Sequence, residues 1–296
     1  MPAGSSKAPE ALSGVAPLSA RYDGFILDLW GVIHDGVTAY PGAASCLAAL
    51  KAAQKPVVLL TNAPRPAQVV STLMDGMGIP EDLYKGIITS GDAVNLELAQ
   101  RKNPEFAALG SKVCLVGPER DYGTLDGLPM TKVDSPEEAD WVLMTGPVDL
   151  SDTVEKYVPL MARMRAKDLP MVCANPDQYV IREGKKVMCA GLLAQSYSAM
   201  GGTVINRGKP DPAVYYLALE MLDLGPEAKV AVIGDGLHTD MPGAEASGLD
   251  GILVTGGLNA QPLGIRHGEK ADPAKVATLM AKHGLSPVAM IPAFVW

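Results

Sequence analysis

Short aliphatic runs recur along the outer parts of this chain, and each ends in a polar residue or in glycine. The strongest strand candidates are Phe25–Trp30, Pro56–Thr61, Gly86–Thr89 and Lys229–Gly234. Helical stretches accompany them at Ala43–Gln54, Pro66–Met77 and Pro212–Leu222. Because strands that alternate with helices form parallel βαβ units, the pattern predicts an α/β fold with a doubly wound, Rossmann-like parallel sheet.

The middle third of the chain repeats this alternation by itself. Its expected strands are Lys112–Val116, Trp141–Met144 and Met171–Ala174, and its expected helices are Thr153–Lys167 and Gly191–Met200. We therefore expect an α/β cap domain inserted over residues 93–204, and a core domain formed by residues 21–92 and 205–296, which ends with a helix at Asp272–His283. Residues 1–20 contain no continuous apolar run and are expected to form a flexible N-terminal tail.

The charge and composition of the chain exclude some partners. Its 296 residues carry a formal net charge of −8, so a broad basic face for nucleic acid is not expected. No apolar run approaches the length of a membrane span, so no membrane partner is expected. The four cysteines are far apart and form no CxxC pair, which is typical of buried free thiols and indicates a cytoplasmic protein.

Carboxylates follow two of the expected strands. Asp28 comes after the run Phe25-Ile26-Leu27, where a carboxylate can act as a nucleophile, although a turn-capping role would explain it equally well. Asp235 and Asp240 lie in a glycine-bearing loop after the strand at Lys229–Gly234. With Asp28 they could hold a hard divalent cation such as Mg²⁺, the alternative being that both cap turns or helices.

Two further segments could bind a phosphoryl group. Thr61 and Asn62 end the strand at Pro56–Thr61, where a hydroxyl and a backbone N–H can hold an anionic oxygen before a helix N-terminus. Lys209 lies between Gly208 and Pro210 and precedes the helix Pro212–Leu222. A Lys fixed in this way is a suitable point charge, although most Lys residues are simply exposed.

Taken in chain order, these segments resemble the haloacid-dehalogenase superfamily of aspartate-nucleophile hydrolases, in particular its class IIA subfamily. The four matching segments are Asp28-Leu29-Trp30-Gly31-Val32, Thr61-Asn62, Gly208-Lys209-Pro210, and Gly234-Asp235 through Asp240. The insertion, with Ala174-Asn175-Pro176-Asp177, resembles the large α/β cap of that subfamily.

The resemblance implies a role for each matched residue. Asp28 would be the nucleophile and a Mg²⁺ ligand, Asp235 a second ligand, and Asp240 a ligand acting directly or through water. Thr61, Asn62 and Lys209 would bind the phosphoryl group of a small phosphorylated metabolite. Asn175 and Asp177 would help to select the leaving group at the mouth of the site. Caps of this subfamily often mediate dimers, so a homodimer is a further expectation.

Trp30 departs from the family pattern, which usually has Asp at this position. Its backbone carbonyl could still bind Mg²⁺, but its indole N–H has no acid/base equilibrium to use. Losing general acid–base help typically costs 10²–10⁴-fold in rate.

Three interpretations of Trp30 follow. Another group, such as His34 or Asp35, or metal-bound water could replace the missing acid. The leaving group could need no proton, as in an aryl phosphate, an acyl phosphate or a haloacid. The protein could also bind ligands with little turnover. The dipeptide Asp35-Gly36 is itself a strong hairpin-turn signal, and His34 is the better proton carrier of the two.

Overall fold

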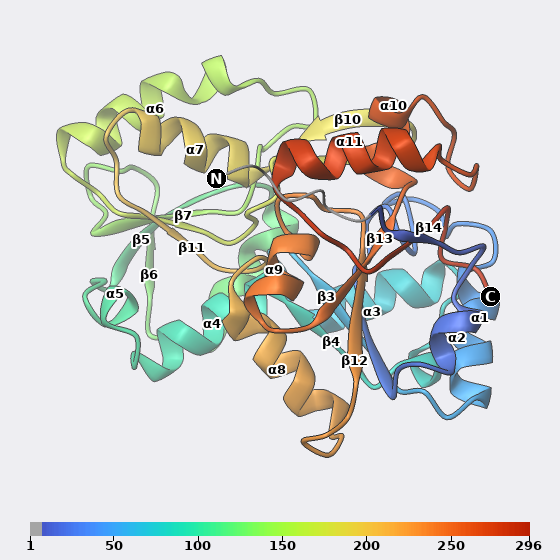
Figure 1. The fold of residues 1–296 in the computed structure, drawn as a ribbon. Coiled ribbons are helices and arrows are strands. Elements are labelled where there is room, and N and C mark those ends of the chain that lie inside the picture. Colours follow the sequence, from blue (N-terminus) through green and yellow to red (C-terminus); the bar gives the residue numbers. More distant parts are fainter. Residues whose placement is uncertain (1–7) are drawn as a thin grey trace, which may run out of the picture.

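The computed structural model describes residues 8–296. Its larger sheet has seven strands in the order β1-β14-β13-β12-β2-β3-β4 (Figure 1). Their bounds are β1 Glu10–Ala11, β2 Gly24–Leu27, β3 Val57–Thr61, β4 Gly86–Thr89, β12 Val230–Gly234, β13 Asp250–Val254 and β14 Ala289–Ile291. All neighbouring strands are parallel. The predicted doubly wound sheet is therefore confirmed.

Helices cover both faces of this core sheet, because its strands are apolar on both sides. One face packs against α1 (Ala16–Ser19), α2 (Ala43–Ala52) and α3 (Ala67–Gly76). The other face packs against α8 (Pro212–Leu222), α9 (Asp240–Ala246), α10 (Ala260–Leu263) and α11 (Pro273–His283). Short 3₁₀ turns lie at η1 (Glu81–Leu83) and η3 (Gly257–Asn259).

A second sheet lies beside the first and is built from the middle of the chain (Figure 1). Its parallel strands, in the order β11-β8-β7-β5-β6, are β5 Lys112–Val116, β6 Thr131–Val133, β7 Trp141–Met144, β8 Met171–Cys173 and β11 Val204–Asn206. One face packs against α6 (Val154–Ala166) and α7 (Ala190–Ala199). The other packs against α4 (Ser90–Gln100), α5 (Pro104–Ala107) and the 3₁₀ turn η2 (Glu119–Leu125).

An antiparallel hairpin projects from the second sheet toward the core. It consists of β9 (Tyr179–Arg182) and β10 (Lys185–Met188), and β10 lies near α10 and α11 at the top of Figure 1. The domain limits at residues 93 and 204 stay a prediction. Residue 93 lies inside α4, and residue 204 is the first residue of β11. We refer below to the second sheet, its helices and this hairpin as the cap.

The expected flexible tail over residues 1–20 is wrong from Glu10 onward; residues 1–7 lie outside the described part of the chain. Glu10 and Ala11 pair with β14 at the edge of the core sheet. Val15 and Leu18 are buried in the core, and the N–H of Val15 donates to the carbonyl of Val295. Two apolar side chains and one edge pairing are enough to fix this segment against the sheet.

The expected strand Phe25–Trp30 ends earlier than predicted, at Leu27. Gly31 has φ +77, and the N–H groups of Ile33 and His34 both donate to the carbonyl of Leu29. The chain therefore turns directly after Asp28, which leaves this carboxylate at the C-terminal edge of the sheet.

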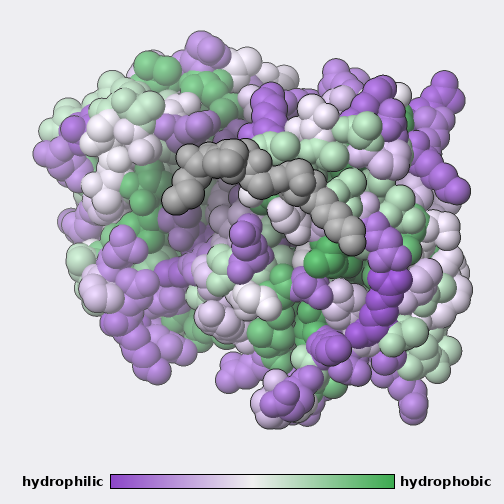
Figure 2. Space-filling view, viewed as in Figure 1, coloured by the Kyte–Doolittle hydropathy of each residue, from purple (hydrophilic) through white to green (hydrophobic). Residues whose placement is uncertain are grey.

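The longest helix of the described chain, α6, has 13 residues. None of the helices in residues 8–296 is both long and apolar enough to cross a bilayer. On the face drawn in Figure 2, hydrophilic and hydrophobic side chains are interspersed.

Candidate active site

Three carboxylates and one ammonium converge at the C-terminal edge of the core sheet. Asp28 follows β2, Asp235 follows β12, and Asp240 begins α9. Ligand oxygens of these three carboxylates lie within 4.8 Å of one another. The Nζ of Lys209 lies 2.5 Å from Oδ1 of Asp28 and 2.8 Å from Oδ1 of Asp240. The structure thus brings together the residues to which the sequence assigned catalysis and metal binding.

Asn62 holds Lys209 in place through the backbone. Its Oδ1 accepts from the N–H of Lys209 at 2.7 Å, and its Nδ2 donates to the carbonyl of Lys209 at 3.2 Å. Gly208 has φ +124, and a Cβ there would lie 2.5 Å from Oδ1 of Asn62. Only glycine allows this approach. The Asn62 side chain is therefore used for positioning, so a phosphoryl contact from Asn62 would come from its backbone.

Asp235 is held by the segment that follows β13. Its Oδ2 accepts from the N–H of Leu258 at 2.7 Å, and its carbonyl accepts from Nδ2 of Asn259 at 2.7 Å. A Cβ at Gly31 or Gly257 would lie 2.0 Å or 1.9 Å from Oδ2 of Asp235. Two glycines at positive φ thus make room for this carboxylate.

Burial and mutual repulsion shift the ionisation of the cluster. Burial and then Asp240 raise the pKa of Asp28 well above its ordinary value, and Lys209 opposes them. Burial raises the pKa of Asp235 to about 8, although the hydrogen bond from the N–H of Leu258 acts to lower it. Burial alone would lower the pKa of Lys209, but Asp240, Asp28 and Asp177 together raise it. Such shifts are typical of sites that handle charge, and a divalent cation would relieve the repulsion.

The donor set fits a hard divalent cation such as Mg²⁺. Carboxylate oxygens are the ligands that Mg²⁺ prefers. Within residues 8–296, no hydrogen bond engages Oδ2 of Asp28 or Oδ1 of Asp235. A cavity of about 20 Å³, enough for one water molecule, lies among Asp28, Trp30 and Asp235. Asp240 is already used by Lys209 and, through Oδ2, by the N–H of Gly236, which favours an indirect role for it.

The remaining phosphoryl candidate, Thr61, is buried at the end of β3 with 1% of its surface exposed. Its Oγ1 accepts from the N–H of Ala63 at 3.2 Å. This bond orients the hydroxyl and leaves its proton for an acceptor.

Trp30 and His34 lie together in the turn after Asp28. Their rings are 5.3 Å apart in a T-shaped arrangement, and the Nδ1 of His34 accepts from the N–H of Gly36. Burial lowers the pKa of His34 to about 4. Oδ1 of Asp35 accepts hydrogen bonds from the N–H groups of Val37 and Thr38. These bonds form the turn that the dipeptide Asp35-Gly36 predicted. His34 is thus neutral near pH 7, which makes it a poor proton donor to a leaving group.

The cap brings Asp177 to the catalytic edge. Its Oδ1 accepts from Nδ2 of Asn62 at 3.0 Å, and burial raises its pKa, opposed by Lys209. Asp177 lines the 20 Å³ cavity together with Asp28. Asn175 precedes Asp177 in the same loop, and its Oδ1 accepts a hydrogen bond from the N–H of Asp177 at 3.2 Å. Asp177 therefore faces the reacting groups, and Asn175 orients it.

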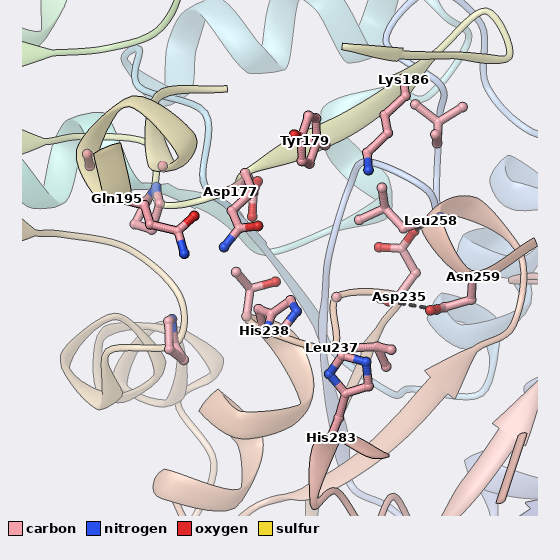
Figure 3. A pocket seen from close by; sticks show the side chains of 18 of the residues that line it. Asp177, Tyr179, Lys186, Gln195, Asp235, Leu237, His238, Leu258, Asn259 and His283 are labelled. Atoms are coloured by element: carbon pink, nitrogen blue, oxygen red, sulfur yellow. Dashed lines mark hydrogen bonds between the residues drawn. The ribbon is translucent and has the colours of Figure 1, made fainter. Parts of the chain in front are cut away.

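Two larger cavities adjoin the cluster. One of about 960 Å³ lies between the cap and the segments around α9 and α11, and Figure 3 shows it with Lys186 and Gln195 from the cap and Asp235, His238 and His283 from the core. The other, of about 280 Å³, lies beside Trp30 and Asn62. Asp177 lines both.

Sequence reasoning missed several residues of this site. Asn259 follows a strand, β13, that was not predicted, so its place at the same sheet edge was hidden. Arg65 stands three residues after Asn62 in the same loop and could have been found by that spacing. Arg120 and Arg182 have no such signal, because only the packing of the cap brings them near the core.

Comparison with known proteins agrees with this geometry. A family model described as haloacid dehalogenase-like hydrolase matches residues 25–128, and one described as HAD-hydrolase-like matches residues 206–281. The crystal structure of a haloacid dehalogenase-like hydrolase from Brucella suis is 33% identical, with a TM-score of 0.82, and the match covers 96% of this chain and 100% of that one.

Curated relatives at lower identity are phosphatases. The acid sugar phosphatase of Staphylococcus haemolyticus is 26% identical over 80% of this chain and 87% of its own length. The ribonucleotide monophosphatase NagD of Escherichia coli is 28% identical over 79% of this chain and 88% of its own length. The chain belongs to the haloacid dehalogenase-like hydrolases, and it is a hydrolase of that family's α/β fold.

Proposed function

We propose that this protein is a Mg²⁺-dependent phosphatase that hydrolyses a small phosphate monoester through an aspartyl-phosphate on Asp28. The observation that carries the proposal is the position of Lys209, whose Nζ bridges Asp28 and Asp240 beside Asp235. The phosphatases among its relatives support the reaction class.

In the first step, an oxygen of Asp28 attacks phosphorus while the bond to the leaving oxygen breaks. Lys209 is fully buried, so its charge acts at low dielectric on the phosphoryl oxygens and on the attacking carboxylate. The Thr61 hydroxyl would donate to a phosphoryl oxygen. Bound Mg²⁺ at Asp28 and Asp235 would neutralise phosphoryl charge. Water then cleaves the acyl phosphate and restores Asp28 with release of inorganic phosphate.

Asp177 supplies the proton transfer that Trp30 cannot. Its pKa is raised by burial, so it can carry a proton to the leaving oxygen as the first bond breaks. The resulting carboxylate can then accept a proton from the attacking water. His34, with a pKa of about 4, is the weaker candidate for this role.

The test measures hydrolysis of p-nitrophenyl phosphate and glycerol phosphate with Mg²⁺, with EDTA, and with the Asp28→Asn variant. We expect Mg²⁺-dependent release of phosphate from both esters and none from the variant. Rapid quenching followed by mass spectrometry of peptides should place one phosphoryl group on Asp28. Activity that survives Asp28→Asn, or halide release from a 2-haloacid without added metal, would contradict the proposal.

A further inference from the structure

Arginines from three separate segments line the 280 Å³ cavity beside the catalytic cluster. Arg65 lies in the loop after β3, Arg120 lies in η2, and Arg182 ends β9. The hydroxyl of Thr124, in η2, donates to the carbonyl of Pro64, which fixes η2 against the loop that carries Arg65. The core and the cap thus build this cationic wall together.

Two carboxyl groups, Asp121 and Asp177, line the cavity with these three guanidinium groups. Asp121, 2% exposed, lies 3.1 Å from Nε of Arg65 and 4.0 Å from Nε of Arg120. Nε of Arg65 and Oδ1 of Asp121 are not aligned for a hydrogen bond. Both atoms are buried and have no hydrogen-bond partner among the described residues. Arg182 donates only to the carbonyl of Gly36, at 3.4 Å, among the described residues.

The other carboxylate of the cavity, Asp177, is held by Asn62. The wall therefore carries three guanidinium groups against two carboxyl groups, Asp121 and Asp177, in a chain whose net charge is −8. A cation-rich cavity in an acidic protein is an electrostatic trap for an anion.

The rest of the wall sets how large the anion can be. The Trp30 ring closes one side, and a Cβ at Gly36 would lie 2.0 Å from it, so the ring and this turn are packed against each other. At about 280 Å³ the cavity is near the lower limit for small-molecule sites. Only a compact group fits beside a phosphoryl group held at Asp28.

We propose that this cavity binds a second anionic group of the substrate, a carboxylate or a second phosphate, remote from the phosphoryl group that is cleaved. The inference rests on the proposed function, since it places the scissile phosphoryl at Asp28. Arg120 and Arg182 are the donors, because planar guanidinium groups pair bidentately with carboxylate or phosphate. Arg65 keeps its role beside Asp121.

The test uses matched esters that differ by one acidic group. Glycerol 1-phosphate is compared with 3-phosphoglycerate, and fructose 6-phosphate with fructose 1,6-bisphosphate, so the two pairs separate a carboxylate from a second phosphate. The values of kcat/KM are measured for the wild type and for Arg120→Gln and Arg182→Gln. The control is Arg163→Gln, which removes a cap charge that is half exposed and paired with Glu137 outside the cavity.

We expect the wild type to prefer the doubly acidic ester of at least one pair by about 10-fold or more. Each cavity variant should lower that preference by about 10-fold, the worth of one charge-assisted hydrogen bond, and the control should not. No preference in either pair, or a preference that both cavity variants retain, would overturn the inference.

Binding separates this inference from the proposed function. Calorimetry of the same esters with Asp28→Asn, with and without the arginine substitutions, measures the binding affinity in the absence of hydrolysis. If the wild type shows no phosphatase activity, preferential binding that depends on Arg120 and Arg182 would refute the catalytic proposal and keep the anion site. Equal binding of both members of each pair would refute the anion site alone.

Discussion

The catalytic edge of the core and the cap surface that faces it differ in how firmly they are held. Asp28, Lys209, Asp235 and Asp240 are at most 8% exposed and bond mainly to one another or to backbone groups. On the cap side, the side chain of Arg120 is 52% exposed, and Asp177 and Arg182 are half-buried. A buried, well-bonded catalytic cluster in the core beside more exposed side chains in the cap indicates that the core performs the reaction and the cap selects the substrate.

This comparison predicts that core substitutions lower activity on every substrate, whereas cap substitutions act selectively. The largest effect should come from Asp28→Asn, which keeps the shape of the side chain and removes the nucleophile. We expect a loss of roughly 10⁴-fold or more in kcat on all phosphate esters. Steady-state assays on an aryl and an alkyl phosphate measure it. A loss confined to one of the two substrates would break the division between core and cap.

The next largest effect is expected for Asp177→Asn in the cap, because it removes the proposed proton donor. Turnover of glycerol phosphate should fall by about 10²–10⁴-fold, whereas p-nitrophenyl phosphate, whose leaving group needs no proton, should lose far less. The matched control is His34→Asn, which should affect both substrates equally. If Asp177→Asn lowers both rates alike, Asp177 only positions Asn62 and the substrate.

Lys209→Met tests the electrostatics of the core cluster. It leaves Asp28 and Asp240 buried beside Asp235 without their cation. We expect kcat to fall by about 10²–10³-fold and the protein to become less stable, because an unpaired buried charge is costly. Added Mg²⁺ should restore more of the thermal stability in this variant than in the wild type. Unfolding scans with EDTA and with Mg²⁺ check this, and an equal Mg²⁺ response would contradict it.

The same contrast explains what could be predicted from the sequence. Asp28 and Asp235 follow strongly apolar runs and Thr61 ends one, so these runs alone located all three at the ends of strands, which meet at one edge of a parallel sheet. Helix α8 was predicted with its observed bounds, Pro212–Leu222, because Pro opens it and an apolar stripe continues it. Local signals of this kind were sufficient for the core.

The missed parts depend on contacts between distant segments. Strand β1 has two residues and α1 has four, too short for any periodic signal, and both exist because they pack on the core sheet. The hairpin of β9 and β10 carries Arg182 to Gly36, across 146 residues of sequence. No pattern within either segment encodes that approach, so the cap side of the site had to come from the structure.

The smallest predicted effect concerns His34, where the turn of the core meets the cap side. Burial lowers its pKa from the ordinary value of 6.5 to about 4 in the folded protein, so between these pH values the unfolded chain binds a proton that the folded one does not. Stability from this group is complete above pH 6.5 and is lost as the pH falls toward 4, by about 3 kcal/mol.

The variant His34→Asn keeps an acceptor for the N–H of Gly36 and removes the titration. The difference between the unfolding free energies of wild type and variant, measured in urea from pH 7.5 to 4, isolates His34 from the buried carboxylates, whose raised pKa values act in the opposite direction. A difference that does not change with pH would mean that His34 titrates normally. His34 would then be open to solvent, and the turn that carries Trp30 would belong with the looser cap side rather than with the rigid core.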